Sequence, residues 1–433
     1  MSVLFRKVEF DEISRAAHSR AGLKRSKRIA IVGAGPGGTA FGLELLAQGV
    51  DPEDIVLIDK ARFPRPKLCG GGITWRGTEW LERVLGHRPQ GGATTSRLEF
   101  RSELGTVFVR ERGPQWVYDR GELDHALLAA CIERGIEVRQ ETNVSAIEPG
   151  IEGFRIRHGK NVVQTFEWVV GADGAGGLCR RMSGLRGGLT GRLVEAVFEP
   201  IDADARADTL VFDFDPILDG IPGYAWIFPY PDPEKRTGRF KIGVMDGRGV
   251  VPGEVLRRWT MEFAALRGFR LADSKIHGWP ERYFDAGVVG HRPGLILVGE
   301  ALGIDALLGE GIAPSLFIAS YAAKRLRSAL DGRSVKISGY ESGFLATEEG
   351  RNLWFQARLA DRLYGKNRLR WLRVLFGMSR LRELAEGGTD AYGRLAKRIP
   401  TLLAHSAWDF ARRGVPSAEP LAHRSVAESS DVQ

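Results

Sequence analysis

A glycine-rich turn between an apolar strand and a helix is the feature that most constrains how this chain folds. It lies in the stretch RIAIVGAGPGGTAFGLELLAQG, residues 28–49. The apolar run at 29–32 predicts a short buried strand. Residues 39–48 have helical spacing, with an apolar side formed by Phe41, Leu45 and Leu46. Together they predict the first half of a β-α-β unit.

The turn has the spacing G-x-G-x-x-G and reads Gly33, Ala34, Gly35, Pro36, Gly37 and Gly38. The first glycine allows a tight turn, the second lets a pyrophosphate approach the backbone, and the third lets helix and strand pack closely. The N–H groups at the helix start then meet the negative charge of the phosphates. On its own this spacing also occurs in other glycine turns, so its context decides.

The context is a second apolar run, residues 54–58, that ends at Asp59 and is followed by Lys60. Asp59 lies about twenty residues beyond the glycine turn, where a dinucleotide-binding unit has the acid that bonds a ribose hydroxyl. A helix cap or a surface charge is the alternative for this acid. We expect the turn glycines, Pro36, Asp59 and Lys60 to contact a dinucleotide cofactor.

Two further glycine turns indicate which dinucleotide binds. WVVGADGAGGLCRR, residues 168–181, predicts a strand that runs into a turn containing Asp173. Residues 294–326 predict another strand, turn and helix. The residues expected to contact the cofactor in this segment are Gly299, Glu300, Gly309, Gly311 and Ile312. N–H groups at a helix start can neutralise a reduced isoalloxazine, and a carboxylate can bond ribityl hydroxyls. Both features suit a flavin.

In this order, the segments resemble the FAD-binding segments of the flavoprotein group that includes aromatic hydroxylases, flavin-dependent halogenases and geranylgeranyl reductases. The resemblance runs from about residue 28 to 330 and implies that FAD is the cofactor. In a fourth segment, YDRGELDHALL, Arg120 and Asp124 stand where the group has a cofactor-contacting arginine and an acid that opens a helix. A solvated charge is the alternative for Arg120. The chain departs from the group at Glu300, where the relatives have the shorter aspartate.

The segment RFPRPKLCGGGI resembles the P-x-x-K-x-C-G-G-G segment of geranylgeranyl reductases and matches it at Pro64, Lys67, Cys69, Gly70, Gly71 and Gly72. Glycines let the backbone lie close to a planar ring or an apolar substrate, and a cysteine offers a polarisable, ionisable group. The resemblance implies that Lys67, Gly70 and Gly71 contact FAD. It also implies that Gly72 contacts substrate and that Cys69 is catalytic. The alternatives are a buried inert cysteine and a lysine that holds a phosphate.

A second mark of the same reductases is IPGYAWIFPYPD, which resembles their Y-x-W-x-F-P segment at Tyr224, Trp226, Phe228 and Pro229. Alternation along a strand places the three aromatic residues on one face. Spacing alone favours a core stripe. The resemblance instead implies that this face lines an isoprenoid cavity beside the flavin, with Tyr224 and Trp226 catalytic and Phe228 in contact with substrate. Halogenases have W-x-W-x-I-P at a comparable place, so oxygen-using chemistry stays open.

Composition and charge indicate where the protein works and what kinds of partner it binds. No stretch approaches the roughly 20 consecutive apolar residues of a membrane span, and residues 1–28 lack the apolar run of a secretory signal. We therefore expect a cytoplasmic protein. The three cysteines, Cys69, Cys131 and Cys179, show no metal-ligand spacing, so no metal is expected. The net charge of +8 favours anionic partners, but no nucleic-acid recognition motif is present.

The expected fold class is α/β (α+β): a Rossmann-type FAD-binding domain with an antiparallel-sheet substrate domain and a C-terminal helical region. The expected boundaries are an N-terminal extension at 1–27, a discontinuous FAD-binding domain at 28–91, 119–185 and 285–330, a substrate-binding sheet at 92–118 and 186–284, helices at 331–420 and a disordered tail at 421–433. The helices predicted after about residue 330 are basic and also contain a set of apolar residues. Three interpretations stay open: the helices cap the substrate cavity, pack as a bundle on the main body, or lie on an anionic membrane surface. That set is Trp354, Phe355, Trp371, Leu372, Leu375 and Phe376.

A single dinucleotide fingerprint implies that NADPH, NADH or a reduced electron carrier visits the flavin transiently. The resemblance implies a reductase that saturates C=C bonds of a prenyl (geranylgeranyl-like) or related apolar substrate. The alternative is a flavin-dependent monooxygenase or halogenase that acts on an aromatic or polyketide-like molecule. The motifs carry no information on the oligomeric state.

Overall fold

The computed structural model describes residues 28–377, apart from 110–112, 152, 183–187, 204–205, 233–237, 273–274 and 288–289. The described residues lie in one compact unit. The extension predicted at 1–27, the tail predicted at 421–433 and the end of the predicted helical region lie outside them. The domain boundaries given above remain predictions.

The first layer is a six-stranded sheet in the order β19-β20-β12-β1-β2-β8. Its strands are β1 (Ile29–Val32), β2 (Ile55–Ile58), β8 (Glu137–Arg139), β12 (Trp168–Gly171), β19 (His291–Arg292) and β20 (Leu295–Leu297). All pairs are parallel except β19 with β20. Parallel strands are covered on both faces, which explains why β1, β2, β12 and β20 are continuous apolar runs that are fully buried.

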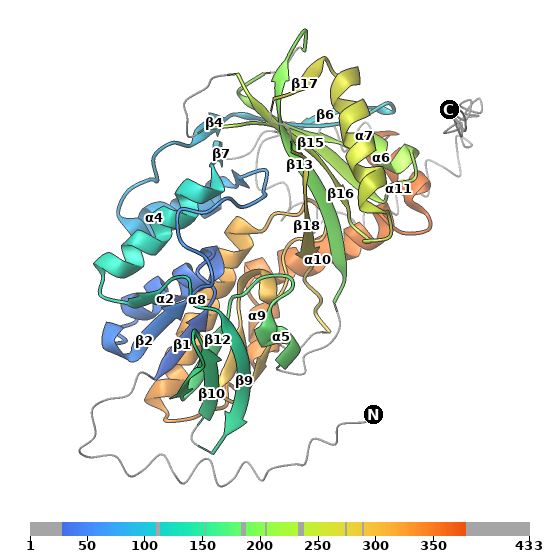
Figure 1. Cartoon of the computed structure of the whole chain (residues 1–433). Helices are drawn as coiled ribbons and strands as arrows, with labels where there is room; N and C mark the ends of the chain where they lie inside the picture. Colours follow the sequence, from blue (N-terminus) through green and yellow to red (C-terminus); the bar gives the residue numbers. More distant parts are fainter. Residues whose placement is uncertain are drawn as a thin grey trace, which may run out of the picture. The chain divides into compact units, whose positions relative to one another are not determined.

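The helix after the glycine turn is α2 (Pro36–Ala47), so it begins three residues earlier than the pattern predicts. Proline suits the first helical position, because its φ is already helical and its missing N–H would have no partner there. The predicted one-sided burial is wrong: the first ten residues of α2 are all buried. The helix packs against α8 (Ile312–Asp331) and α4 (Arg120–Glu133) beside the sheet (Figure 1).

The second layer is an eight-stranded sheet in the order β17-β13-β16-β15-β14-β5-β6, with β18 also paired to β13. Its strands are β5 (Arg97–Ser102), β6 (Gly105–Val109), β13 (Thr190–Pro200), β14 (Thr209–Asp213), β15 (Gly223–Pro229), β16 (Phe240–Asp246), β17 (Phe269–Leu271) and β18 (His277–Arg282). Helix α7 (Gly253–Leu266) packs on β13 and β16 and lies along the sheet in Figure 1.

The large sheet is antiparallel as predicted, except for the parallel pair β5–β14. Parallel neighbours need a long crossover, and here the chain between them contributes β8 and β12 to the six-stranded sheet before it returns. Residues 92–118 also differ from the prediction. Strands β4 (Ala93–Thr95) and β7 (Gln115–Val117) form a separate small sheet with β3 (Gly72–Ile73). A further small sheet contains β9 (Val144–Gly150), β10 (Gly153–His158) and β11 (Val162–Phe166).

The remaining helices connect and flank the sheets. They are α3 (Trp75–Leu85), α5 (Leu178–Met182), α6 (Asp215–Leu218), α9 (Tyr340–Leu345), α10 (Glu348–Leu363) and α11 (Arg368–Gly377), with the short helices η1 (Pro52–Asp54) and η2 (Gly299–Ala301). The last three α-helices agree with the predicted helical region. None of the helices in the described part of the chain combines the length and apolar character that a bilayer crossing requires.

The α2 interface gives a test of the packing. Phe41 is 0% exposed, whereas Leu266 at the end of α7 is 77% exposed. We expect Phe41→Ala to lower the free energy of unfolding by about 3–5 kcal/mol, because it leaves a cavity between sheet and helices. Leu266→Ala serves as the control and should change it by less than about 0.5 kcal/mol. Urea unfolding measures both, and equal effects would contradict the burial of α2.

Candidate active site

The first glycine turn is built so that two glycines pack and one faces open space. A side-chain carbon at Gly33, whose φ is +107°, would overlap the Ala172 carbonyl oxygen, and one at Gly38 would overlap the Gly33 carbonyl oxygen. At Gly35 the nearest atom to such a carbon is an Arg65 nitrogen 3.9 Å away. The start of α2 has no side-chain cap and no acid in its first turn. This end of the helix can therefore hold an anion in front of Gly35.

Asp59 lies at the end of β2 and fixes the same turn. One carboxylate oxygen accepts the Ala34 N–H and the other accepts the Ala61 N–H, each at 2.7 Å. Each oxygen can accept a further hydrogen bond. The structure therefore leaves Asp59 able to bond a ribose hydroxyl, and Lys60 is exposed beside it. Their contact with a cofactor remains a prediction.

The turn around Gly299 meets the first turn directly. A side-chain carbon at Gly37 would lie 3.0 Å from the Gly299 Cα. Helix α8 begins at Ile312 after Gly311, again with no side-chain cap and no acid in its first turn. The fold thus provides a second uncapped helix start, at the position where the sequence predicts the flavin ring.

Asp173, in the segment 168–181, bonds to the protein through one of its two carboxylate oxygens. One of its carboxylate oxygens accepts the Cys179 N–H at 2.8 Å. The other is buried without a hydrogen-bond partner among the described groups. Burial raises the pKa of Asp173, and the Cys179 hydrogen bonds counteract this shift. A buried acceptor without a donor, next to open glycine turns, fits a site that a polar cofactor completes.

Arg120 and Asp124 form a buried bidentate ion pair, with nitrogen–oxygen distances of 2.9 and 3.0 Å. Arg120 is 7% exposed, so the alternative of a solvated charge is wrong. Burial opposes its charge, but Asp124 and Cys69 beside it raise the pKa of Arg120 overall. Asp124 does not open the helix. That role belongs to Asp119, which accepts the Gly121 and Glu122 N–H groups.

Arg65 joins this pair, and its guanidinium lies 3.3 Å from the Asp124 carboxylate. Sequence reasoning missed Arg65, although it stands inside the RFPRPK segment that the reductase pattern covers. Its position between the Asp124 carboxylate and the open space at Gly35 makes it a further candidate for binding an anion.

Close contacts explain two of the three consecutive glycines, Gly70 and Gly71. A side-chain carbon at Gly70 would lie 2.9 Å from the Phe228 ring, and one at Gly72 would lie 3.4 Å from it. Gly71 has φ +81°, and a side-chain carbon there would overlap the Tyr118 carbonyl oxygen. Cys69 is half-buried, whereas Cys131 and Cys179 are buried. The structure does not place Cys69 among the fully buried cysteines, and its catalytic role remains a prediction.

The aromatic residues of β15 share one face, as predicted. The rings of Tyr224 and Trp226 are 5.9 Å apart, and Phe212 of β14 packs on both Tyr224 and Phe228. All four are buried, and the face contacts Gly70 through Phe228 and Trp226. The rings are buried, as a core stripe predicts, and the glycine segment lies against them. The cavity beside the flavin remains a prediction.

The polar groups of this face already have partners. The Tyr224 hydroxyl donates to the Leu308 carbonyl, and the Trp226 indole N–H donates to Glu195 at 3.1 Å. Burial raises the pKa of Tyr224 well above its ordinary value. The hydroxyl therefore stays protonated, with its proton directed at a carbonyl one residue before Gly309.

Sequence reasoning also missed Glu281, because no motif surrounds it in HGWPERYF. Its carboxylate would lie 3.1 Å from a side-chain carbon at Gly309 and accepts the Tyr283 hydroxyl at 3.4 Å. Burial and the nearby Glu300 raise the pKa of Glu281 to about 8, whereas Lys67 lowers it. Glu281 is therefore a protonated carboxyl near neutral pH.

Lys67 belongs to the same group of charges. Its ammonium lies 3.7 Å from the centre of the Trp279 ring. Burial lowers the pKa of Lys67, and the charge of Glu300 counteracts this shift. Burial also raises the pKa of Glu300, which Lys67 counteracts. Lys67 thus faces carboxylates, and binding of a phosphate by this lysine remains a prediction.

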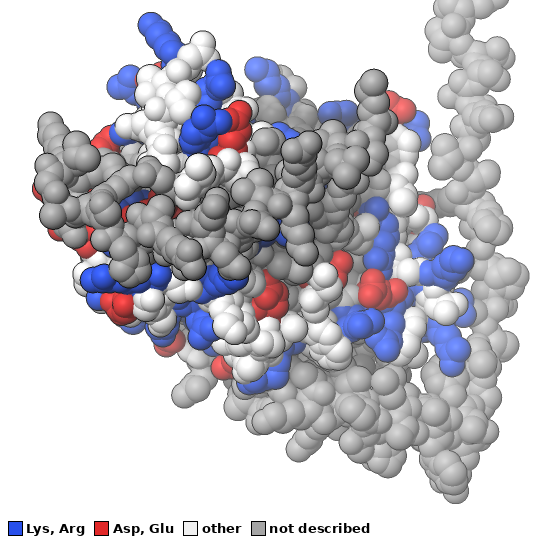
Figure 2. Space-filling model, turned by 90° about the horizontal axis from the view of Figure 1, so that it is seen from below, with Lys and Arg blue, Asp and Glu red and all other residues white. Residues whose placement is uncertain are grey.

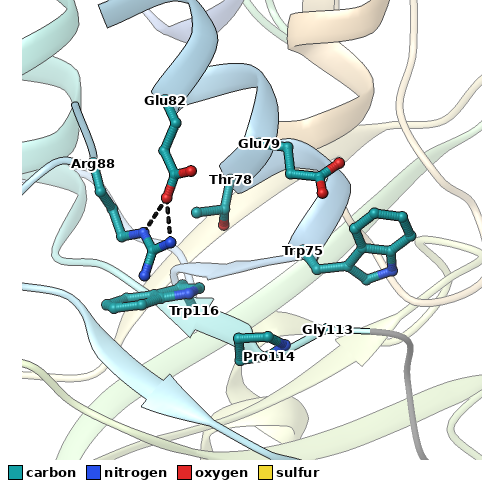
Figure 3. A pocket seen from close by; sticks show the side chains of 8 residues that line it. All are labelled: Trp75, Thr78, Glu79, Glu82, Arg88, Gly113, Pro114 and Trp116. Atoms are coloured by element: carbon teal, nitrogen blue, oxygen red, sulfur yellow. Dashed lines mark hydrogen bonds and ion pairs between the residues drawn. The ribbon is translucent and has the colours of Figure 1, made fainter. Parts of the chain in front are cut away.

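A pocket of about 430 Å³ lies beside α3 and β7 and is separate from these residues (Figure 3). Its lining is Trp75, Thr78, Glu79, Glu82, Arg88, Gly113, Pro114 and Trp116, which includes none of the predicted site residues. Arg88 pairs with Glu82 and lies 4.4 Å from the Trp116 ring centre. Across the described ranges, no group of three or more acidic, histidine or cysteine side chains is arranged to hold a metal.

Glu281 makes stability depend on pH. Between its ordinary value of 4.5 and the native value of about 8, the native state keeps a proton that the unfolded chain has released. Native stability therefore falls as pH rises through this window. We expect Glu281→Gln to flatten this fall. Thermal unfolding at pH 6 and at pH 8.5 measures the difference, and an unchanged pH dependence would show that Glu281 is ionised in the native protein.

Comparison with known proteins agrees with this geometry. Residues 27–214 match the FAD binding domain family. The chain is 27% identical to digeranylgeranylglycerophospholipid reductase of Methanocella arvoryzae, over 67% of this chain and 74% of that protein. It is 26% identical to menaquinone reductase of Mycolicibacterium smegmatis, over 69% of this chain and 76% of that protein.

Solved structures share the fold at low identity. A geranylgeranyl bacteriochlorophyll reductase-like protein from Thermoplasma acidophilum has a TM-score of 0.65 and 18% identity, covering 88% of this chain and 99% of that one. A halogenase in complex with phloroglucinol and FAD has a TM-score of 0.62 and 15% identity, covering 83% of each chain. These findings confirm the predicted fold class and the predicted resemblance: residues 27–214 match an FAD binding domain, and the chain is similar to reductases of the geranylgeranyl type.

Proposed function

We propose that this protein is an FAD-dependent reductase that saturates C=C bonds of a prenyl or related apolar substrate. The observation that carries the proposal is the contact of the Cys69–Gly72 segment with the aromatic face of β15. This contact joins the two segments that resemble geranylgeranyl reductases. Two of the relatives found are reductases by name, which supports the same reaction class.

The residues present fit FAD. The open space at Gly35 and the uncapped start of α2 suit the pyrophosphate, Asp59 suits the ribose, and the uncapped start of α8 suits the flavin ring. Glu300 is proposed to bond the ribityl chain. When bound and reduced, FAD supplies a hydride for addition to a double bond. NADPH, NADH or a reduced electron carrier is proposed as the transient reductant.

The chain's own residues must supply a dry cavity and a proton, because an isolated alkene is a poor hydride acceptor. The buried rings of Tyr224, Trp226 and Phe228 exclude water from their side of the site. The Tyr224 hydroxyl is held by the Leu308 carbonyl. Cys69 is half-buried and is therefore the more accessible of the two proposed proton donors.

An apolar lipid substrate suits a protein that works at a membrane surface from the cytoplasm, and we propose such a peripheral contact. Basic side chains predominate over acidic ones on the face shown in Figure 2. Trp354 on α10 is 45% exposed and Leu369 on α11 is 47% exposed. The exposed basic residues of the same helices and their connection are Arg351, Arg358, Arg362, Lys366, Arg370 and Arg373. Both features suit an anionic lipid surface.

A flavin-dependent monooxygenase or halogenase acting on an aromatic or polyketide-like molecule is the second candidate. The observation in its favour is that a halogenase covers 83% of this chain with a TM-score of 0.62. Tyr224 and Phe228 stand where the halogenase pattern has tryptophan and isoleucine, which favours the reductase.

A reduction assay tests the reaction. FAD-loaded protein, NADPH or dithionite and a geranylgeranyl lipid are incubated without oxygen, and mass spectrometry is expected to show the addition of two hydrogens per saturated bond. Cys69→Ser should lower kcat by about 10²- to 10⁴-fold if the thiol donates the proton. Cys131→Ala, at a buried cysteine, is the control. A hydroxylated or halogenated product that forms only with oxygen would overturn the reductase proposal.

The cofactor site has a separate test. Gly35→Asp introduces a side chain where there is space, but it adds negative charge at the start of α2. We expect a folded protein whose FAD affinity falls at least about tenfold, because the acid opposes the pyrophosphate. Gly253→Asp, at the start of α7, is the matched control. Circular dichroism and FAD titration measure both, and full FAD affinity in Gly35→Asp would contradict the proposed pyrophosphate position.

A further inference from the structure

A buried ion pair lies behind the Cys69 segment and has no part in the function described so far. Glu195 on β13 is 2% exposed and Lys241 on β16 is 6% exposed, and the nearest nitrogen–oxygen distance between them is 3.9 Å. Burying two charges costs several kcal/mol per ion before their attraction and hydrogen bonds offset it. The hydrogen bonds that Glu195 and Lys241 make to other groups therefore indicate the role of the pair.

The register of the sheet aligns Glu195 with the aromatic face. Glu195 pairs with Gly243 on β16, and Gly243 pairs with Trp226 on β15, so the three lie in one row across three strands. A side-chain carbon at Gly243 would overlap the indole ring of Trp226. The glycine in the middle of the row thus lets the indole cross the central strand and donate its N–H to Glu195 at 3.1 Å.

Lys241 connects the same row to the cysteine. Its ammonium donates to the Cys69 carbonyl oxygen at 2.8 Å and lies 4.8 Å from the centre of the Tyr230 ring. Burial raises the pKa of Glu195, and three groups counteract this shift: the Lys241 ammonium, the Trp226 indole N–H and the backbone N–H of Cys69. Lys241 therefore joins the Cys69 carbonyl to the same buried pair that holds the Trp226 indole.

We infer that Glu195 and Lys241 are positioning residues that together fix the main chain of Cys69 and the indole of Trp226 in one arrangement. Lys241 holds the peptide of Cys69 through its carbonyl, and Glu195 holds the indole and pairs with Lys241. The thiol and the aromatic wall then keep a constant relation to each other. The effect on turnover rests on the proposed function, whereas the fixed position of the segment does not.

Amide hydrogen exchange of the FAD-loaded protein tests the inference without any substrate. In Lys241→Met, which removes the donor to the Cys69 carbonyl, we expect exchange in residues 67–72 to rise about three- to tenfold, the effect of losing one hydrogen bond. Glu195→Ala removes the counter-ion of Lys241 and should change exchange in the same direction. Asp213→Asn is the control, since Asp213 is a fully buried acid in the same sheet that pairs with Arg101 and Arg267 instead. It should lower global stability without raising exchange in residues 67–72.

The double variant Glu195→Gln with Lys241→Met separates positioning from a merely structural role. It has no unpaired buried charge, so global stability should recover relative to either single change. The Cys69 carbonyl still lacks its donor, so exchange in residues 67–72 should stay high. Exchange that returns to the wild-type level with stability, or that rises equally in Asp213→Asn, would overturn the inference.

The turnover rate tests whether the pair affects catalysis. In the anaerobic reduction assay, Lys241→Met should lower kcat by about tenfold or more with KM within about twofold, because a misplaced group costs rate more than binding. An unchanged kcat would contradict the link between the pair and catalysis. If no lipid is reduced by the wild-type protein, the proposed function fails, while the exchange experiment still decides whether the pair fixes the cysteine segment.

Discussion

The close approach of three glycine turns is the constraint on which the rest of the structure depends. Gly33 packs on Ala172, and Gly37 packs on Gly299, so segments far apart in the chain meet backbone to backbone at one edge of the six-stranded sheet. No side chain fits between them. Because parallel strands end at this edge, the uncapped starts of α2 and α8 lie near these turns, and Asp59 at the end of β2 bonds the first turn through the Ala34 N–H.

The second constraint is the contact between the two sheets. The glycines after Cys69 allow the backbone to reach the rings of Trp226 and Phe228, and Lys241 from the large sheet reaches back to the Cys69 carbonyl. The candidate site is therefore made by both layers at once. The glycine turns and uncapped helix starts lie on one side of the site, and they suit a polar cofactor. The aromatic rings of β15 lie on the other side, and they suit an apolar substrate.

Local patterns were sufficient for several elements and for the resemblance to known flavoproteins. The period of apolar residues predicted β1, α2 and β2 to within a few residues, and the aromatic alternation of β15 was visible in YAWIF. Long-range contacts were not predictable in this way. Glu195, Lys241 and Glu281 stand in strands without any motif, and their environment arises only when distant strands come together. The assignment of Asp124 rather than Asp119 as the helix-opening acid failed because α4 begins at Arg120, directly after Asp119, so that Asp124 lies beyond its first turn.

The parallel pairing of β5 with β14 has a consequence for how the chain assembles. Strands β5 and β6 leave the ribosome well before β14, and β8 and β12 of the six-stranded sheet are synthesised between them. During that interval the edge of the early hairpin has no native neighbour, and exposed strand edges invite association with other chains. The β5–β6 hairpin thus waits for β14, so the order of synthesis and the order of strand pairing differ at this place in the large sheet.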